Sequence, residues 1–216
     1  HDRAVVSATF VQMRFIASEK KCVFVRVRPQ LLEDSYSQSL FHSHGFIEAK
    51  MHLTADLTSQ LPITIPEEEL LANMRKATRY EIKKARKEGI TVTTTTDPKE
   101  IKEFYDIQIE TAKRHHFIPF SYEFFLQQFT VFFEAKKALM YKAYLGKTLL
   151  TQAFIIFYGS EAVYHYGTGT EAGRKHPGAY LIQWEAIKEA KKRGKARYNF
   201  WGIAPMDNPK HRFYGV

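Results

Sequence analysis

Residues 174–205 read RKHPGAYLIQWEAIKEAKKRGKARYNFWGIAP. Pro177 and Gly178 mark the start of a helix, and Gly194 follows a last turn of three cations that suits the negative end of the helix dipole. The apolar residues of this helix recur at helical spacing, and two aromatic ones widen the apolar face: Ala179, Ile182, Ala186, Ile187, Ala190, Tyr180 and Trp184. An aromatic strand, Ala196–Trp201, follows after a short turn. We expect a largely covered helix whose first N–H groups are open to an anion.

A regular series of elements precedes this helix. A β-prone run at 90–96 leads into a helix at 98–113, which Asp97 caps, with Glu100 completing the capping box. Ser121 opens a second helix through residue 133. Three strands follow, at 139–145, 148–158 and 162–167, with glycine in both turns. Strand, two helices, three-stranded meander, long helix and strand is the order typical of the GNAT-type acyltransferase core.

The first 57 residues predict part of another mixed unit. Val5–Met13 and Cys22–Val27 have the composition of paired strands. Residues 31–44 predict a short amphipathic helix that stops at Gly45, and residues 46–57 predict an extended segment. This order resembles the later part of a domain whose beginning lies outside the sequence, which starts at His1 without Met.

The segment from Pro66 to Glu88 predicts one long helix, with three glutamates at its positive end and Gly89 after its last turn. We therefore expect an α/β (α+β) fold of tandem GNAT-like acyltransferase domains, the first incomplete. The expected limits are 1–65 for the partial first domain, 66–89 for the connecting helix, and 90–216 for the second domain, truncated at its C-terminal end.

One outward stripe of the predicted connecting helix is strongly basic. It carries Arg75, Arg79, Lys83 and Arg86. A merely solvated face would more often mix charges of both signs, and like charges four residues apart slightly destabilise a helix. We expect this stripe to bind an anion such as nucleic acid, in agreement with the net charge of +9, although many soluble proteins are basic.

Other classes of site find little support in the sequence. Cys22 is the single cysteine, so no intrachain disulfide can form, and its apolar neighbours predict a buried structural thiol in a reducing compartment. The pairs His42/His44 and His115/His116 lack further ligands at metal-binding spacing, so we expect no metal. There is no phosphate-binding P-loop, no nucleophile elbow, no signal peptide and no apolar run of transmembrane length.

The turn before the 178–193 helix departs from the pattern of acetyl-CoA users. These enzymes carry Arg/Gln-x-x-Gly-x-Gly/Ala, whose N–H groups hold the pyrophosphate. The corresponding residues, 175–180, keep one glycine, while Pro177 has no N–H to donate and Tyr180 replaces a small residue. The turn therefore favours another acyl donor, and we expect no cofactor.

Three segments together resemble one family. LLANMRKATRYEIKKARKEGI from Leu70, PGAYLIQWEAIKEAKKRG from Pro177 and YNFWGIAP from Tyr198 are similar to segments of FemABX-type peptidyltransferases. The resemblance covers most of the chain. It implies two GNAT-like domains and an enzyme of bacterial cell-wall biogenesis, which transfers an amino acid from aminoacyl-tRNA to the stem peptide of a peptidoglycan precursor and so builds the interpeptide bridge.

The resemblance also implies roles for single residues. Arg114 would bind the diphosphate of the precursor, and Tyr166 would line the same cleft. The lysine that serves the transfer in the family is expected beyond Val216, so no catalytic residue is assigned. With this donor, the basic stripe of Arg75, Arg79, Lys83 and Arg86, inferred above from its charge, is expected to bind the tRNA.

The expected partners are aminoacyl-tRNA and a lipid-linked or UDP-linked muropeptide. A monomer in the cytoplasm is expected, in transient contact with the inner face of the membrane. Two other functions stay open at this point: a GNAT-type N-acetyltransferase that uses acyl-CoA, and a non-catalytic RNA-binding module.

Overall fold

The computed structural model describes residues 3–29, 31, 34–50, 57–115 and 117–204. The chain divides into two compact units, His1–Thr54 and Ala55–Val216. The domain limits at residues 65 and 89 stay a prediction.

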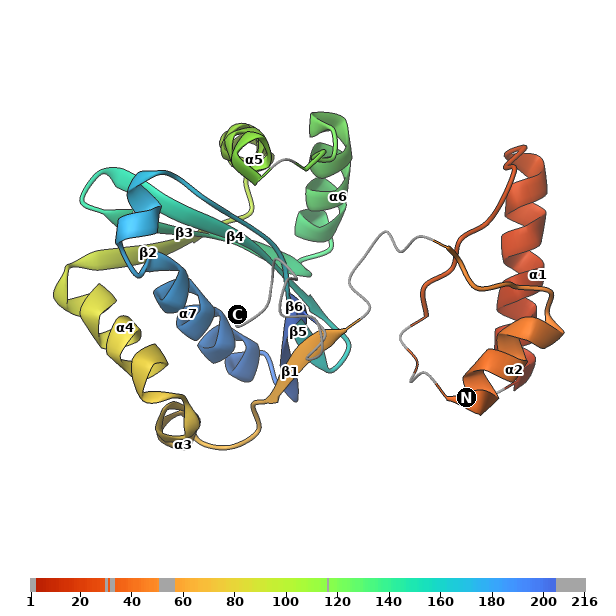
Figure 1. Cartoon of the computed structure of the whole chain (residues 1–216), viewed down its shortest axis with the longest axis horizontal. Helices are drawn as coiled ribbons and strands as arrows, with labels where there is room; N and C mark the ends of the chain where they lie inside the picture. Colours follow the sequence, from red (N-terminus) through yellow and green to blue (C-terminus); the bar gives the residue numbers. More distant parts are fainter. Residues whose placement is uncertain (1–2, 30, 32–33, 51–56, 116, 205–216) are drawn as a thin grey trace. The chain divides into compact units, whose positions relative to one another are not determined.

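The second unit has a six-stranded sheet with helices on both faces (Figure 1). Its elements are β1 (Thr58–Pro62), α3 (Glu67–Asn73), α4 (Lys76–Lys87), β2 (Ile90–Thr95), the 3-10 turn η1 (Pro98–Glu100), α5 (Ile101–His115), α6 (Tyr122–Glu134), β3 (Ala138–Leu145), β4 (Thr148–Tyr158), β5 (Glu161–Gly169), the 3-10 turn η2 (Ala172–Lys175), α7 (Gly178–Lys192) and β6 (Arg197–Gly202). The strand order is β1-β6-β5-β4-β3-β2, and only β5 and β6 run parallel. The predicted α/β class and the order of elements after residue 90 are confirmed.

Local signals in the sequence explain why these elements begin and end where they do. The Asp97 carboxylate accepts a hydrogen bond from the N–H of Lys99, and the Ser121 hydroxyl accepts one from the N–H of Phe124. Both caps satisfy N–H groups that have no partner inside the helix. Gly89 has a φ of +77° directly after α4, a conformation that costs glycine little.

The sheet separates two hydrophobic cores. On one face, α3, α4 and α7 cover a core that includes Trp184, Tyr198 and Ile155. On the other, α5 and α6 cover a core of stacked phenylalanines in which the Phe129 and Phe154 rings lie parallel, 3.7 Å apart. Figure 1 shows α4 and α7 on one side of the sheet and α5 and α6 on the other. Ala179 and Tyr180, expected on the covered face of α7, are exposed.

The predicted helix at 66–88 is two helices. Met74 and Arg75 have extended ψ angles of 150° and 144°, which separate α3 from α4. The Arg79 guanidinium donates to the carbonyl oxygens of Ala72 and Met74 and so satisfies the open end of α3. No glycine or proline marks this break, so the apolar spacing alone predicted a continuous helix.

The first unit corrects two other predictions. Val5–Met13, predicted as a strand, lies within α1 (Arg3–Glu19), and Cys22–Val27 forms no strand. The half-buried or buried positions of α1 are Val6, Ser7, Phe10, Met13 and Ala17. This helical spacing overrides the β propensity of the valines. Without a strand at residues 22–27, Cys22 is exposed rather than buried.

The short helix predicted before Gly45 is confirmed as α2 (Ser35–Ser43), and the side chain of Asp34 caps it. Its Phe41 ring lies 5.1 Å from that of Phe10 in α1, and the Phe46 ring lies 4.6 Å from Phe10. Residues 51–56 of the predicted extended segment lie outside the described residues, and residues 46–50 form no regular strand.

We predict that Phe129→Ala lowers the free energy of unfolding by about 3–5 kcal/mol, because it removes a fully buried ring stacked on Phe154 and leaves a cavity. Val131→Ala in the same helix should change it by less than about 0.5 kcal/mol, because the Val131 side chain is exposed. Urea denaturation of both variants measures the difference. Equal losses would contradict the assignment of this core.

Candidate functional site

The sheet opens where its parallel strands stop pairing. β5 and β6 pair only from Glu161 opposite Arg197 to Val163 opposite Asn199. Beyond these pairs, β5 continues along β4 to Gly169, whereas β6 continues along β1 to Gly202. In sheets of this kind, ligands commonly bind at the carboxyl ends of parallel strands, where neighbouring connections lead in different directions.

A β-bulge in β5 lies directly beyond the last parallel pair. Phe154 of β4 faces Tyr166, but the next residue, Ile155, faces Tyr164, so β5 has one extra residue at His165. Tyr164 and Tyr166 therefore contribute to opposite cores. Simple alternation along the strand would have placed both rings on one face.

The Tyr166 ring packs among the aromatic side chains beneath α5 and α6. Its centroid lies 5.1 Å from that of Phe125, 6.0 Å from Phe129 and 6.3 Å from Phe120. Burial raises the pKa of Tyr166 to about 12, so its hydroxyl stays neutral at physiological pH. Tyr166 can thus donate a hydrogen bond, but it is no general base at neutral pH.

Arg114 is held at the carboxyl end of the same strand. It lies in the last turn of α5, and its Nη2 donates to the Gly169 carbonyl oxygen and to Thr111 Oγ1, each at 3.1 Å. Thr111 in turn bonds Thr168 of β5 at 3.2 Å. Among the described residues, nothing accepts from Nε or Nη1 of Arg114. The structure thus brings Arg114 and Tyr166 to the same end of β5, with donors of the guanidinium left for an anion.

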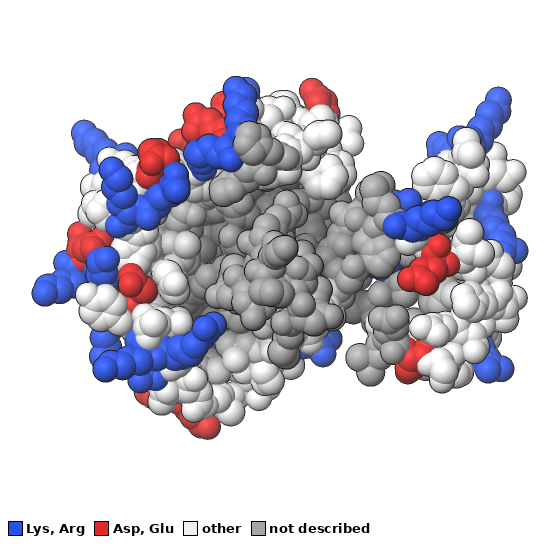
Figure 2. Space-filling model, in the orientation of Figure 1, with Lys and Arg blue, Asp and Glu red and all other residues white. Residues whose placement is uncertain are grey.

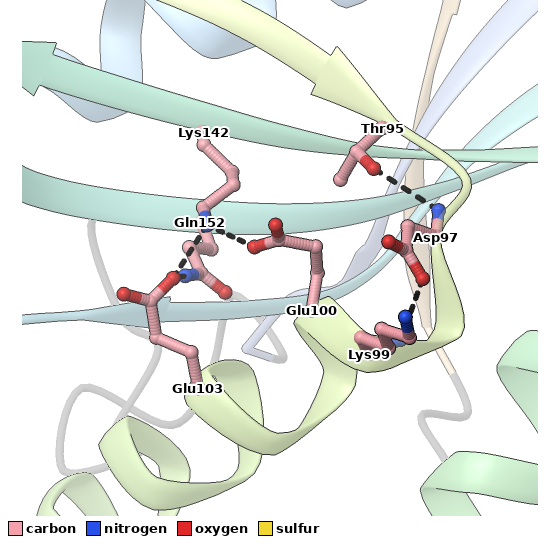
Figure 3. Close-up of polar contacts among 7 residues, drawn as sticks. All are labelled: Thr95, Asp97, Lys99, Glu100, Glu103, Lys142 and Gln152. Carbon is pink, nitrogen blue, oxygen red and sulfur yellow. Dashed lines mark hydrogen bonds and ion pairs between the residues drawn. The ribbon is translucent and has the colours of Figure 1, made fainter.

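An ion cluster around the buried Lys142, which the sequence reasoning missed, fixes the other end of α5 (Figure 3). Lys142 of β3 has a side chain 8% exposed, and its Nζ lies 2.5 Å from a carboxylate oxygen of both Glu100 and Glu103. Burial alone would lower the pKa of Lys142, but the hydrogen bonds to these carboxylates outweigh it and raise the pKa. Gln152 of β4 donates to Glu103 at 2.8 Å. Lys142 lies two positions after Met140, so the alternation of a strand places both side chains on the same, inward face. A lysine at such a position was the signal in the sequence for this cluster.

The turn that leads into α7 is packed tightly against the sheet and against α4. A methyl group on Gly173 would come within 1.9 Å of the Leu150 carbonyl oxygen, and one on Gly178 within 3.2 Å of Ala143. His176 Nδ1 lies 2.9 Å from an Oε2 atom of Glu88, at the end of α4. A carboxylate therefore lies beside His176, two residues before the first residue of α7.

The four basic residues assigned to RNA have different surroundings. Arg75 and Lys83 are exposed and form no ion pair or hydrogen bond of their side chains with the described residues. The Arg79 guanidinium donates a hydrogen bond to the Ala72 carbonyl oxygen at the end of α3, and the Arg86 guanidinium lies 3.4 Å from the Glu185 carboxylate of α7. Figure 2 shows Lys and Arg side chains over α4 with acidic side chains among them, so the surface is less uniformly basic than the stripe predicts.

The described residues show neither a cluster of metal ligands nor a membrane-spanning helix. Within the described ranges, no three His, Cys, Asp or Glu side chains gather as metal ligands would. In the first unit, His44 instead bonds Ser7 at 2.9 Å and the Leu40 carbonyl oxygen at 2.8 Å. His116 and the side chain of His115 lie outside the described residues. Over the described part of the chain, every helix is too short or too polar to cross a membrane.

Residues 72–208, more than half of the chain, match the family model of the acetyltransferase (GNAT) domain. The chain belongs to the GNAT family. A crystal structure of FemX aligns with a TM-score of 0.81 at 17% identity, over 99% of this chain and 72% of the FemX chain. The structure of L-PGS from Bacillus licheniformis aligns with a TM-score of 0.55 at 15% identity, over 83% of this chain and 53% of that one. No curated protein sequence matches the chain.

At these identities the two structures establish the fold of the chain and nothing finer. The GNAT-type α/β fold expected from the FemABX resemblance, similar to that of FemX, is confirmed, and the tandem arrangement is supported in part. Membership of the GNAT family identifies an acyltransferase. The roles of Arg114, Tyr166 and the basic residues stay predictions.

The GNAT core keeps its architecture here, whereas its anion-binding turn has changed. The Glu88 carboxylate bonds His176, two residues before α7 begins, and Pro177 at the N-cap has no N–H to donate. Tyr180, in the first turn of α7, is 45% exposed. An anionic pyrophosphate would meet a like charge and fewer donors than in the pattern of acetyl-CoA users.

We predict that Lys142→Met destabilises the protein by about 1–2 kcal/mol, because two carboxylates then lose their shared cation. The loss is smaller than for a fully buried pair, since the side chains of Glu100 and Glu103 are 39% and 47% exposed. Lys102→Met, which breaks the exposed pair with Asp106, is the matched control and should cost less than about 0.5 kcal/mol. Thermal unfolding of the two variants decides, and a Lys142 effect no larger than the control would disprove the role of the cluster.

Proposed function

We propose that the protein is an aminoacyltransferase that moves an amino acid from aminoacyl-tRNA to the stem peptide of a peptidoglycan precursor. The observation that carries the proposal is a GNAT core in which the Glu88 carboxylate bonds His176, in the turn that leads into α7. Such a core still places an acyl donor and an amine side by side, but it disfavours a donor held by its pyrophosphate. The FemX-like fold agrees with this choice.

The chemistry of such a transfer asks little covalent help from the protein. An aminoacyl ester is already activated, so no nucleophilic side chain is needed. The acceptor amine must lose a proton, and the oxyanion that develops needs positive charge or N–H donors nearby. The residues of this chain would contribute by positioning the two substrates, and the lysine that serves the transfer is proposed to lie beyond Val216.

Arg114 and Tyr166 are proposed to hold the acceptor. The guanidinium of Arg114 is anchored at Gly169 through Nη2, which leaves Nε and Nη1 facing a diphosphate in a fixed orientation. The neutral Tyr166 hydroxyl, on the same strand, can donate to a carbonyl or phosphate oxygen. The bulge places Tyr166 on the face of the sheet that α5 covers, and α5 carries Arg114.

Donor tRNA is proposed to lie along α4. Arg75 and Lys83 are the side chains of the stripe with donors left for phosphate, whereas Arg79 and Arg86 contribute charge while they hold α3 and α7. The domain limits predicted from the sequence, 1–65, 66–89 and 90–216, would place this helix between the two halves. The enzyme is proposed to act as a monomer in the cytoplasm, in contact with the inner face of the membrane.

The direct test uses the full-length protein with a mixture of charged tRNAs and a muropeptide precursor, and follows the mass of the precursor. An increase by one or more amino-acid residues is expected with charged tRNA and none with acetyl-CoA. An acetylated product would instead favour an N-acetyltransferase, which the family model keeps as the second candidate. Binding of RNA without any transfer would favour a non-catalytic RNA-binding module.

We predict that Arg114→Ala in the full-length enzyme raises KM for the precursor roughly ten- to hundredfold, the value of a lost hydrogen bond between charged groups, with little change in kcat. KM rises while kcat changes little because the lost contact stabilises the ground state and the transition state equally. Lys102→Ala in the same helix α5 is the control and should leave both constants unchanged. If Arg114→Ala also leaves both unchanged, Arg114 is only a cation at a helix end.

A second kinetic prediction concerns the tRNA. Replacing Arg75 and Lys83 together by alanine should weaken tRNA binding and reduce the slope of log K against log salt by about 2, one for each lost phosphate contact. The control removes two other exposed lysines of this unit, Lys99 and Lys147. Filter binding from low to high salt measures both slopes, and an unchanged slope in the Arg75/Lys83 variant would remove α4 from the tRNA site.

A further inference from the structure

The face of the sheet that α4 and α7 cover holds a groove of about 1010 Å³. Residues of β2 and Tyr141 of β3 line its floor, and side chains of α4 and α7 flank it. Tyr166 and α5, which carries Arg114, lie on the other face of the sheet. The groove is therefore separate from the candidate site.

The groove runs along β2, which forms one edge of the described sheet (Figure 1). In a strand that pairs on one side only, every second residue turns its N–H and C=O groups away from the partner strand. Within residues 57–115 and 117–204, no group bonds to these outward groups of β2. A row of donors and acceptors at this spacing is matched by another extended backbone, so the edge fits a polypeptide strand.

The two edges of the described sheet differ in how they admit a further strand. β1 contains Pro62 and an irregular register between Thr58 and Gln60, and prolines and bulges both hinder pairing at an edge. β2 pairs with β3 without interruption from Ile90 to Thr95 and contains neither a proline nor a charged residue. The edge beside the groove is therefore the one open to pairing.

A hydroxyl without a partner lies at the floor of the groove. Tyr141 is 2% exposed, and its Oη has no hydrogen-bond partner. Burial raises the pKa of Tyr141, so the hydroxyl stays neutral and can both donate and accept. Thr94 pairs with Tyr141 across the β2–β3 ladder and is exposed. A long side chain that enters from the edge of β2 and crosses Thr94 is thus directed at the Tyr141 hydroxyl.

Most charged side chains of the groove already have partners. Glu185 pairs with Arg86 at 3.4 Å and with Lys188 at 2.5 Å, and Glu189 pairs with Arg193 at 2.7 Å. Among the described residues, two lining charges of opposite sign form no ion pair: Glu67 and Lys192. The groove therefore favours neither an acidic nor a basic segment, and an uncharged one leaves the existing pairs intact.

We propose that the edge of β2 and its groove bind an extended, uncharged segment of a partner protein, which adds a strand to the sheet and directs an amide side chain to Tyr141. This inference does not depend on the proposed function. A second copy of the chain fits less well, because pairing of two β2 edges would bring two α4 helices to the same face of the joined sheet. Each α4 carries six basic residues and one acidic residue, so the two helices would repel each other.

The probe is a blocked peptide in which threonine alternates with valine, glutamine and valine, so that glutamine lies at its centre. Saturable binding to the full-length protein is expected by calorimetry. Hydrogen–deuterium exchange should then slow at residues 90–95 of β2 and stay unchanged at residues 58–62 of β1. The same peptide with N-methyl groups on alternate backbone amides is the control, and it should not bind because it cannot form the ladder.

A second experiment tests the role of the hydroxyl. Tyr141→Phe should weaken binding of the glutamine peptide about two- to tenfold, the value of one hydrogen bond, and change binding of a peptide with leucine in place of glutamine by less than about twofold. Its melting temperature should not fall, since the hydroxyl has no partner to lose. The matched control is Tyr198→Phe, which removes a hydroxyl bonded to Gln183 in the same core and should leave both affinities unchanged.

Absence of saturable binding, equal binding of the N-methylated peptide, or slower exchange at β1 in place of β2 would overturn the inference. Equal effects of Tyr141→Phe on the glutamine and leucine peptides would remove Tyr141 from the site. Self-association of the free protein with slower exchange at residues 90–95 would assign the edge to a second copy and contradict a partner segment. None of these results bears on acyl transfer, so the proposed function is tested separately.

Discussion

At His165, β5 carries one residue more than its partner β4, and both cores depend on that bulge. Tyr164 closes the core beneath α7, and Tyr166 closes the one beneath α5 and α6. Without the extra residue, the rest of β5 would turn its side chains to the opposite faces. Thr168 could then not meet Thr111, and the anchor of Arg114 at the end of the strand would be lost. The position of the candidate site is thus a consequence of strand register.

The sequence predicted those elements that local signals determine. The caps Asp97 and Ser121 and the apolar spacing of α7 act within a few residues, so the order of elements after residue 90 could be read correctly. The bulge at His165 and the cluster around Lys142 depend on partners about 10 to 50 positions away, which no local pattern records. The prediction of a strand at residues 5–13 was wrong because it gave the β-branched residues more weight than the helical spacing of the apolar residues.

The residues of the candidate site could likewise be predicted from the sequence only in part. Arg114 and Tyr166 could be named only through the family resemblance, and the structure brings both to one end of β5. The degraded cofactor turn was visible in the sequence as Pro177 and Tyr180, but the carboxylate beside it was not, because Glu88 precedes His176 by 88 positions. This carboxylate is the strongest physical argument against a pyrophosphate at α7. Under the proposed function, it would disfavour a pyrophosphate donor while the GNAT core is kept.

Isothermal titration calorimetry of the full-length protein with acetyl-CoA and with charged tRNA tests this claim most directly. The account predicts micromolar or tighter binding of charged tRNA that weakens with salt, and no measurable heat with acetyl-CoA. Micromolar binding of acetyl-CoA to the wild-type protein would contradict it, because the Glu88 carboxylate and the missing N–H of Pro177 would then not prevent a pyrophosphate from binding at α7.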